Sequence, residues 1–302
     1  MNPSLIFDFK HYAINDGPGI RITVFFKGCP LSCKWCHNPE SHSIQKQKMY
    51  SREKCIGCED CVEVCAHGAC VLAPEGIITN TEACVLCGKC ADICPTKATV
   101  MSGRELSVDE VMAEIKKEVV FMDQSGGGVT FSGGEPLLHP ELLIPLLDAC
   151  KAAGIHNCVD TSGFAGTNLL LNVAQKTDLF LYDLKLMDSQ RHQKFTGVSN
   201  ELILKNLQSL SNTNTNIIIR IPLIKGINDD EDNIERAVEF ISSLAGNSIP
   251  VELLPYHNTA ARKRDRLGCV PQKPDLNSPL IDRQLEILAL FERAGIATTL
   301  GG

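Results

Sequence analysis

The stretch that decides the fold runs from Arg21 to Cys36 and reads RITVFFKGCPLSCKWC. Its first part, Arg21–Lys27, is rich in β-branched and aromatic residues, which predicts a buried strand. Three cysteines follow directly in the spacing C-x3-C-x2-C, as Cys29, Cys33 and Cys36. Closely spaced cysteines on a loop are typical of a metal centre, so the stretch predicts a metal site at the end of a strand.

Three thiolates can hold an iron–sulfur cube while one of its irons stays without a protein ligand. An open coordination position distinguishes a catalytic metal site from a structural one. We therefore expect Cys29, Cys33 and Cys36 to hold a catalytic 4Fe–4S cluster. The alternative is a cluster whose fourth ligand is a distant cysteine, such as Cys158 or Cys269.

The chain after residue 101 alternates short apolar runs with amphipathic segments, which indicates a parallel sheet or barrel with helices on its outside. We expect the α/β class and an incomplete (β/α)6-type TIM barrel. Strands are expected at 129–132, 156–161, 179–185, 217–223, 251–255 and 296–300. Helices are expected at 107–122, 140–153, 167–176, 200–211, 231–245 and 278–294.

Residues 48–101 interrupt this alternation with two similar cysteine runs, CIGCEDCVEVC at 55–65 and CVLCGKCADIC at 84–94. Their spacing, C-x2-C-x2-C-x3-C, is typical of ferredoxins with two 4Fe–4S clusters, in which the fourth cysteine of each run ligates the other cluster. That rule assigns one cluster to Cys55, Cys58, Cys61 and Cys94, and the other to Cys65, Cys84, Cys87 and Cys90. The alternative is two zinc sites. The chain thus divides into a partial barrel, residues 1–47 and 102–302, and a ferredoxin-like insert, residues 48–101.

Composition limits the function further. The 302 residues are 44% hydrophobic and 22% charged, as in folded globular proteins, with a net charge of −7 that disfavours a nucleic-acid partner. No apolar run is long enough to span a bilayer, and no secretory signal is visible, so we expect a cytoplasmic protein that does not contact a membrane. In a reducing compartment, 15 cysteines are expected to bind metal rather than to form disulfides.

The cysteine motif, with Trp35 before its last cysteine, resembles the signature of radical S-adenosylmethionine (SAM) enzymes. The preceding DGPGIRITVFFKGC (16–29) resembles the glycyl radical enzyme activating enzymes, of which the pyruvate formate-lyase activating enzyme is the best-known member. The resemblance continues through SGGGVTFSGGEPLL (125–138), DTSGF (160–164), YDLKLMDSQRHQKFTGVSN (182–200) and LLPYH (253–257). It covers most of the chain outside the insert.

The resemblance implies that the first cluster binds SAM and cleaves it reductively, and that the resulting 5′-deoxyadenosyl radical removes hydrogen from a backbone glycine of a partner glycyl radical enzyme. It implies an oxidoreductase that works anaerobically, with a flavodoxin- or ferredoxin-like reductant. A monovalent cation is expected near Asp160, Thr161 and Asp183. The residues expected to contact SAM are Trp35, Cys36, His37, Gly133, Gly134, Glu135, Asp160, Asp183, Leu184, Lys185, Arg220 and His257.

Two alternatives remain at this point: a radical SAM enzyme that acts on another peptide or small molecule, and an iron–sulfur electron-transfer protein. Cys29, Gly134, Asp160, Lys185 and His257 all lie at or just past the ends of expected strands. Active sites of barrels gather at that face, so the placement favours an enzyme over an electron carrier. The basic run at 262–266 is expected to be a solvated loop, or else a contact for the partner.

Overall fold

The computed structural model describes residues 4–245, 249–258, 260–268 and 276–301. Within them, nine strands form one sheet in the order β13-β12-β11-β10-β9-β8-β2-β1-β7. The first seven strands of this order, β13 to β2, are parallel to one another. The parallel strands are β2 (Arg21–Phe26), β8 (Gly128–Gly133), β9 (Asn157–Thr161), β10 (Leu179–Asp183), β11 (Asn216–Leu223), β12 (Val251–Pro255) and β13 (Thr298–Leu300). Six crossover connections join these seven strands, as expected for a six-unit partial barrel.

The sheet does not close into a full barrel in the described part of the chain, because β13 and β7 are its two edges. Sequence analysis missed β1 (Leu5–Ala13), which pairs antiparallel with β2, and β7 (Arg104–Glu105), which pairs antiparallel with β1. The outward side of β1 is largely exposed, so its apolar alternation is weak. The hairpin of β1 and β2 covers one edge of the parallel part.

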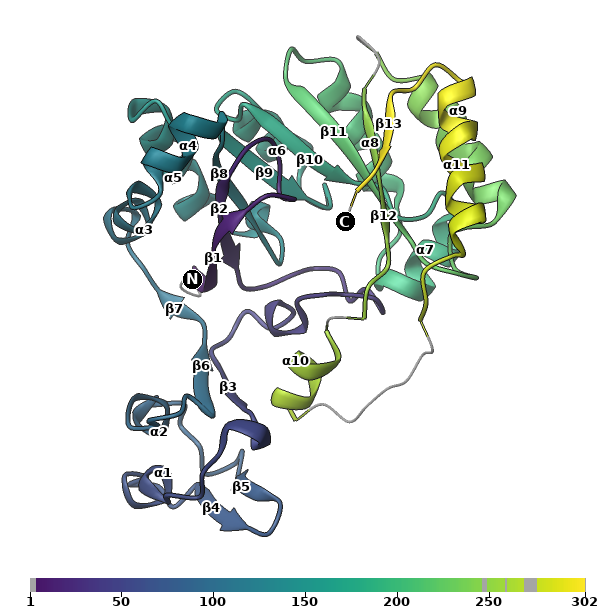
Figure 1. Cartoon of the computed structure of the whole chain (residues 1–302). Helices are drawn as coiled ribbons and strands as arrows, with labels where there is room; N and C mark the ends of the chain where they lie inside the picture. The colour runs from purple at the N-terminus through teal and green to yellow at the C-terminus, as the bar shows by residue number, and fades with distance from the viewer. Residues whose placement is uncertain (1–3, 246–248, 259, 269–275, 302) are drawn as a thin grey trace.

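Most of the helices outside the insert cover the outside of the sheet, whereas α10 lies beside the segment that follows β2 (Figure 1). These helices are α3 (Val108–Lys116), α4 (Val119–Ser125), α5 (Pro140–Ala152), α6 (Thr167–Ala174), α7 (Ser189–Thr196), α8 (Glu201–Ser211), α9 (Glu231–Ser242), α10 (Ala261–Arg266) and α11 (Ile281–Arg293). The chain also has 3-10 turns at Pro39–Ser41, Arg52–Lys54 and Pro136–Leu138. The capping box of Ser107 and Glu110 begins α3.

The helix expected at 107–122 is two helices, which corrects the expectation. It breaks at Glu118, whose side chain is buried and contacts His11 Nδ1 at 2.8 Å. This contact with β1 is tertiary, so the local pattern did not reveal the break. Helix α7 was also missed, because its sequence SQRHQKFT is polar and has little apolar periodicity.

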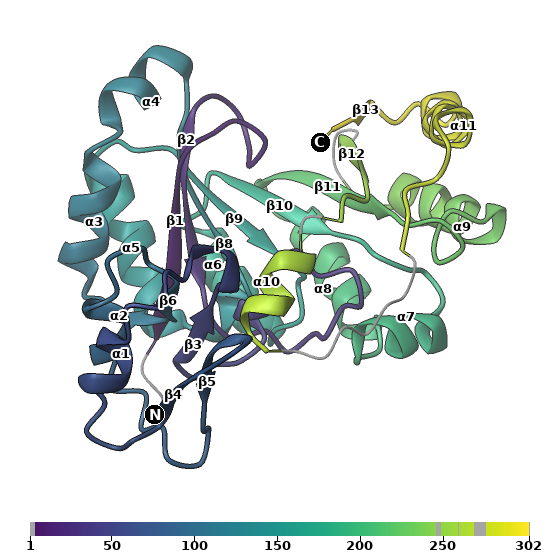
Figure 2. The same ribbon diagram turned by 60° about the horizontal axis from the view of Figure 1, so that its bottom comes forward.

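Residues of the insert project away from the barrel (Figure 1). The chain leaves through β3 (Gln47–Tyr50) and returns through β6 (Thr99–Ser102), and these two strands pair antiparallel. Beyond them lie the short helices α1 (Asp60–Glu63) and α2 (Lys89–Asp92) and the hairpin of β4 (Cys70–Ala73) and β5 (Gly76–Thr79). Figure 2 views the same elements from the insert's side of the molecule. None of the helices described is long and apolar enough to cross a membrane.

Candidate active site

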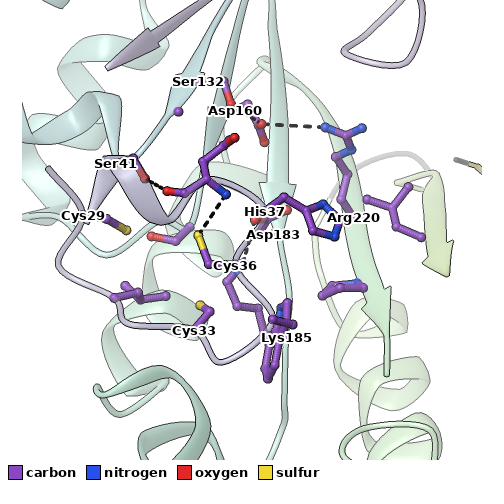
Figure 3. A pocket seen from close by; sticks show the side chains of 18 of the residues that line it. Cys29, Cys33, Cys36, His37, Ser41, Ser132, Asp160, Asp183, Lys185 and Arg220 are labelled. Atoms are coloured by element: carbon purple, nitrogen blue, oxygen red, sulfur yellow. Dashed lines mark hydrogen bonds and ion pairs between the residues drawn. The ribbon is translucent and has the colours of Figure 1, made fainter. Parts of the chain in front are cut away.

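A cavity of about 300 Å³ opens at the C-terminal ends of the parallel strands (Figure 3). Six strands position the residues that line it. The lining includes the cysteine loop after β2 and residues at or just after the ends of the other five strands: Ser132–Gly134 at β8, Asp160–Ser162 at β9, Asp183 and Lys185 at β10, Arg220 and Pro222 at β11, and Leu254–Tyr256 at β12.

The loop that carries the first three cysteines is held against the barrel by α7. Ser32 N donates to the carbonyl of Thr196 at 2.7 Å, and Lys34 N donates to the carbonyl of Phe195 at 3.1 Å. Helix α7 ends at Thr196, where its last carbonyls lack partners inside the helix. The cysteine loop supplies those partners, so helix and loop stabilise each other.

Cys29, Cys33 and Cys36 all line the cavity. Burial raises the pKa of each thiol, to about 12 for Cys36, so a metal centre must displace their protons when it binds. Three soft thiolate donors that face one enclosed space fit an iron–sulfur cluster. Of the two candidate fourth ligands, Cys158 is fully buried and does not line the cavity, and Cys269 lies outside the described residues.

Gly133 and Gly134 line the cavity, and close packing of the backbone requires glycine at both positions. A Cβ atom on Gly134 would lie 2.0 Å from the carbonyl oxygen of Gly28, and one on Gly133 would lie 2.5 Å from Phe26 N. Gly133 also has a φ of +107°. The glycines therefore allow the end of β8 to lie directly against the turn that begins the cysteine loop.

The side chain of Glu135, an expected contact of SAM, lies outside the cavity lining. The carboxylate is completely buried and accepts hydrogen bonds from Thr161 Oγ1 at 2.6 Å and from the Ser162 amide and hydroxyl at 2.9 and 2.6 Å. The Leu137 amide donates to it as well. Glu135 thus joins the end of β8 to the end of β9 and acts as a positioning residue.

Asp160, Asp183 and Lys185 form the charged wall of the cavity. Lys185 Nζ lies 2.7 Å from Asp183 Oδ2, and Ser132 Oγ donates to Asp160 Oδ2 at 2.7 Å. Burial lowers the pKa of Lys185, but the Asp183 carboxylate and the charges of Cys33 and Cys29 together outweigh burial and raise it overall. Burial and the nearby Asp183 charge together raise the pKa of Asp160 to about 7, although Arg220 opposes the rise. Thr161 lies beside them in the lining.

The raised pKa of Asp160 predicts a dependence of stability on pH. A carboxyl group with a higher pKa in the folded chain binds more protons there than in the unfolded chain. Asp160 therefore contributes to stability at pH values below its usual pKa of 3.8, and this contribution is lost as the pH rises through about 7. The free energy of unfolding of Asp160→Asn relative to the unchanged protein should therefore increase across this window. Urea unfolding of the metal-free chain measures it, with Asp123→Asn, at an exposed position, as the control. A difference that falls with rising pH would contradict the assignment.

Arg220 points into the cavity from β11, as expected of a charge in an apolar strand. It lies 3.8 Å from Asp160 and 3.2 Å from Glu252, and its guanidinium donates to the carbonyl of Asn15 at 2.6 Å. The last contact brings Asp16, the first residue of the DGPG segment, into the cavity lining. Sequence analysis did not include Asp16 among the site residues.

The aromatic side of the cavity includes Trp35, His37 and Tyr256. The rings of His37 and Tyr256 lie 5.7 Å apart, and the His37 ring hydrogen-bonds the backbone of His257. The His257 side chain is exposed and, like that of buried Leu184, does not line the cavity. Both expected contacts with SAM thus lie outside the lining, whereas Tyr256, which was missed, lies within it.

The basic run at 262–266 is helical rather than a loop, and part of it stays exposed. It belongs to α10, and its side chains contact the segment that follows the cysteine loop. Lys263 Nζ lies 2.7 Å from Glu40 Oε1 and donates to Asn38, and Arg264 donates to the carbonyl of Cys36 at 3.1 Å. These contacts fix the end of the cysteine loop.

Ser132 was also missed, although it stands directly before the two glycines at the end of an expected strand. The other lining residues that sequence analysis missed are Phe25, Leu31, Asn38, Ser41, Ser162, Pro222, Leu254 and Pro255. Most of them are apolar or small, and nothing in their local sequence marks them.

Comparison with known families agrees with this geometry. Residues 82–240 match the radical SAM superfamily, residues 54–98 match a 4Fe–4S dicluster domain, and residues 15–73, which include Cys29, Cys33 and Cys36, match a 4Fe–4S single cluster domain. Among solved structures, a domain of a pyruvate-formate lyase-activating enzyme from Bacteroides vulgatus is 41% identical, with a TM-score of 0.51, and the alignment covers 58% of this chain and 99% of that one. A radical SAM methyltransferase from Sphaerobacter thermophilus, 13% identical, shares the fold over 99% of this chain and 77% of that one, with a TM-score of 0.54.

Curated relatives align over nearly the whole chain. The trans-4-hydroxy-L-proline dehydratase activating enzyme of Clostridioides difficile is 46% identical over all of both chains. The choline trimethylamine-lyase activating enzyme of Oleidesulfovibrio alaskensis is 42% identical over 88% of this chain and 87% of the relative. The three cysteines of the first loop line one cavity, as a radical SAM site requires. Because its relatives align over nearly its whole length, the chain belongs to the glycyl radical enzyme activating enzymes, which are radical SAM enzymes that generate a glycyl radical in a partner enzyme.

Proposed function

We propose that the partner of this enzyme is a glycyl radical dehydratase of the trans-4-hydroxy-L-proline type. The observation that carries the proposal is the 46% identity over the full length of both chains with the activating enzyme for that dehydratase. The alignment includes the insert, so the whole architecture is shared rather than the barrel alone. The choline lyase activating enzyme, with 42% identity over 88% of this chain, makes choline lyase the second candidate partner.

We place SAM in the cavity of about 300 Å³. When a cluster is bound to Cys29, Cys33 and Cys36, it supplies the electron that breaks the bond between sulfur and the 5′ carbon of SAM. The chain's own residues bind and orient the cosubstrate. The backbone at Gly133 and Gly134 faces the methionine part, Lys185 and Arg220 supply positive charge for its carboxylate, and Trp35 supplies an apolar wall.

A monovalent cation beside Asp160, Thr161 and Asp183 is the second part of the proposal. Asp160 and Asp183 face the same cavity, and their mutual repulsion contributes to the pKa of about 7 for Asp160. A bound cation would favour the ionised form of both carboxylates. The hydroxyl of Thr161 and the two carboxylates are oxygen donors, which suit such a hard ion.

We assign two further 4Fe–4S clusters, rather than zinc, to the insert, with the ligand sets given above. The match of residues 54–98 to a 4Fe–4S dicluster domain supports this assignment. Four cysteines complete each of these clusters, so neither has a position for SAM. Their role is to accept electrons from a flavodoxin- or ferredoxin-like donor.

The partner is tested by mixing the reduced, anaerobically prepared enzyme with SAM and either hydroxyproline dehydratase or choline lyase. The dehydratase should acquire a glycine-centred radical, observed by electron paramagnetic resonance, together with an equivalent amount of 5′-deoxyadenosine. If the dehydratase contains glycine deuterated at its α-carbon, the deuterium should appear in the 5′-deoxyadenosine.

The same dehydratase with its radical glycine changed to alanine is the control and should give no radical. A radical on choline lyase alone would move the assignment to that partner. SAM cleavage without a radical on either protein would overturn both assignments of the partner.

A further inference from the structure

Strand β3 joins the barrel to the insert, and its two faces contact different parts of the molecule. On one face, Gln47 Oε1 accepts a hydrogen bond from the buried Lys27 Nζ at 2.9 Å, which ties the strand to the barrel. On the other face, Lys48 and Tyr50 point into the insert, because alternate residues of a strand share a face. Lys48 and Tyr50 are therefore the residues that β3 presents to the cysteine runs.

Lys48 places a positive charge beside the second cysteine run. Its ammonium donates to Cys70 Sγ at 3.1 Å and to Thr79 Oγ1 at 2.8 Å. Cys70, whose thiol is not among the assigned ligands, packs in one buried cluster with Cys61 and Cys90. In the described part of the chain, no carboxylate lies within 4 Å of Lys48, so its charge is not neutralised by an ion pair.

The sulfurs around Lys48 include those of the second run. Burial lowers the pKa of Lys48, but the hydrogen bond with Cys70 and the charges of Cys90, Cys70 and Cys84 outweigh burial and raise it. The ammonium is therefore close enough to interact with negative charge on Cys84 and Cys90, and also on Cys61 of the first run. It is also half-buried, so solvent ions screen it less than they screen an exposed lysine.

The residue at the equivalent place beside the first run is uncharged. The Tyr50 hydroxyl accepts a hydrogen bond from Ile77 N at 3.0 Å and hydrogen-bonds the Cys55 thiol. The two assigned clusters therefore differ in their contact with β3. Lys48 acts on two ligands of one cluster, Cys84 and Cys90, and on one ligand of the other, Cys61, whereas the neutral phenol of Tyr50 contacts ligands of the first run only. The second run is also the nearer to the barrel, because α2, which carries Cys90, lies between α1 and the barrel (Figure 1).

We propose that Lys48 raises the reduction potential of the cluster held by Cys65, Cys84, Cys87 and Cys90, so that electrons entering the insert reside on the cluster nearer the barrel. Reduction adds one negative charge to a cluster, and a nearby uncompensated ammonium stabilises the reduced form. The inference rests on the proposed presence of two clusters in the insert. In this inference Lys48 sets the reduction potential of an insert cluster and does not contact SAM.

The test is a potentiometric titration followed by electron paramagnetic resonance. The full-length background is Cys29→Ala, Cys33→Ala and Cys36→Ala, in which only the two insert clusters remain to be titrated. Lys48→Met should make reduction of one insert cluster about tenfold less favourable, which is a shift of about 59 mV for a one-electron couple. The other cluster should shift less.

Two control variants isolate the charge at this position. Lys48→Arg keeps the charge and should keep the potential, and Lys46→Met removes the same charge from an exposed position two residues earlier and should leave both potentials unchanged. If Lys48→Met lowers the iron content, Lys48→Gln, which can still donate to Thr79, replaces it in the comparison with Lys48→Arg.

Iron analysis separates the two ways in which the inference can fail. About eight irons per chain with potentials that do not respond to Lys48 would overturn the role of Lys48 and leave the two clusters in place. A background variant with far fewer than eight irons would overturn the two-cluster assignment and the role of Lys48 with it. Equal shifts in Lys48→Met and Lys46→Met would show a general charge effect and would also overturn the inference.

Discussion

Replacing Cys29, Cys33 and Cys36 together by alanine is expected to lower the iron content from about twelve to about eight per chain and to abolish cleavage of SAM. These counts follow from one cluster of four irons on each of the three cysteine groups. The three thiols face the cavity that also contains Asp183 and Lys185, whereas the insert projects away from it. The measurements are iron analysis after anaerobic reconstitution and the yield of 5′-deoxyadenosine.

The matched control is Cys158→Ala, which removes one of the two cysteines considered as a distant fourth ligand. Cys158 is buried on β9, its sulfur lies 3.9 Å from His156 Nδ1, and it does not line the cavity. This variant should keep about twelve irons and should still cleave SAM. Loss of four irons from Cys158→Ala would show that the first cluster has four cysteine ligands and no open iron. About eight irons in the unchanged protein would contradict the count of three clusters.

Lys185→Met is expected to destabilise the protein by roughly 1–3 kcal/mol and to reduce SAM cleavage at least about 100-fold. Lys185 is 9% exposed, and its ammonium lies 2.7 Å from Asp183 Oδ2. Removing the buried partner of this ion pair leaves the partly buried Asp183 carboxylate uncompensated, which accounts for the loss of stability. The remaining carboxylates, Asp183 and Asp160, would then repel the carboxylate of SAM, which accounts for the loss of activity.

The double variant Lys185→Met with Asp183→Asn separates these two effects. It removes both charges of the pair, so much of the lost stability should return. Activity should stay low, because the positive charge for the cosubstrate is still absent. Urea unfolding and the yield of 5′-deoxyadenosine measure the two quantities. Recovery of activity together with stability would show that the pair has only a structural role.

The local sequence was sufficient to predict the cysteine groups and the parallel strands. The spacing of Cys29, Cys33 and Cys36 depends on eight consecutive residues, and the alternation of strands and helices depends on periodicities of two and of 3.6 residues. The position of a residue at the end of a strand also follows from that alternation. This is why Cys29, Gly134, Asp160, Lys185 and His257 were expected together, and the structure brings all of them except His257 to the lining of one cavity.

The same patterns did not predict which way individual side chains point. Glu135 stands beside two glycines of the cavity lining, but its carboxylate is bound by Thr161 and Ser162 of the next strand. His257 ends a matching motif, but its side chain is exposed and Tyr256 lines the cavity in its place. In each case the chain turns at the end of a strand, where strand alternation no longer predicts the facing of a side chain.

The sequence by itself therefore determined which chemistry the chain carries: three cysteine groups, a partial barrel and the signature of a radical SAM activating enzyme. The tertiary structure alone decided that Asp16 reaches the cavity, that α10 fixes the end of the cysteine loop, and that Lys48 contacts Cys70 in the insert. These contacts join residues far apart in the chain, such as Arg220 and Asn15, which are 205 positions apart. Such contacts form only when the sheet brings separate strands together, and no local periodicity encodes which side chains then meet.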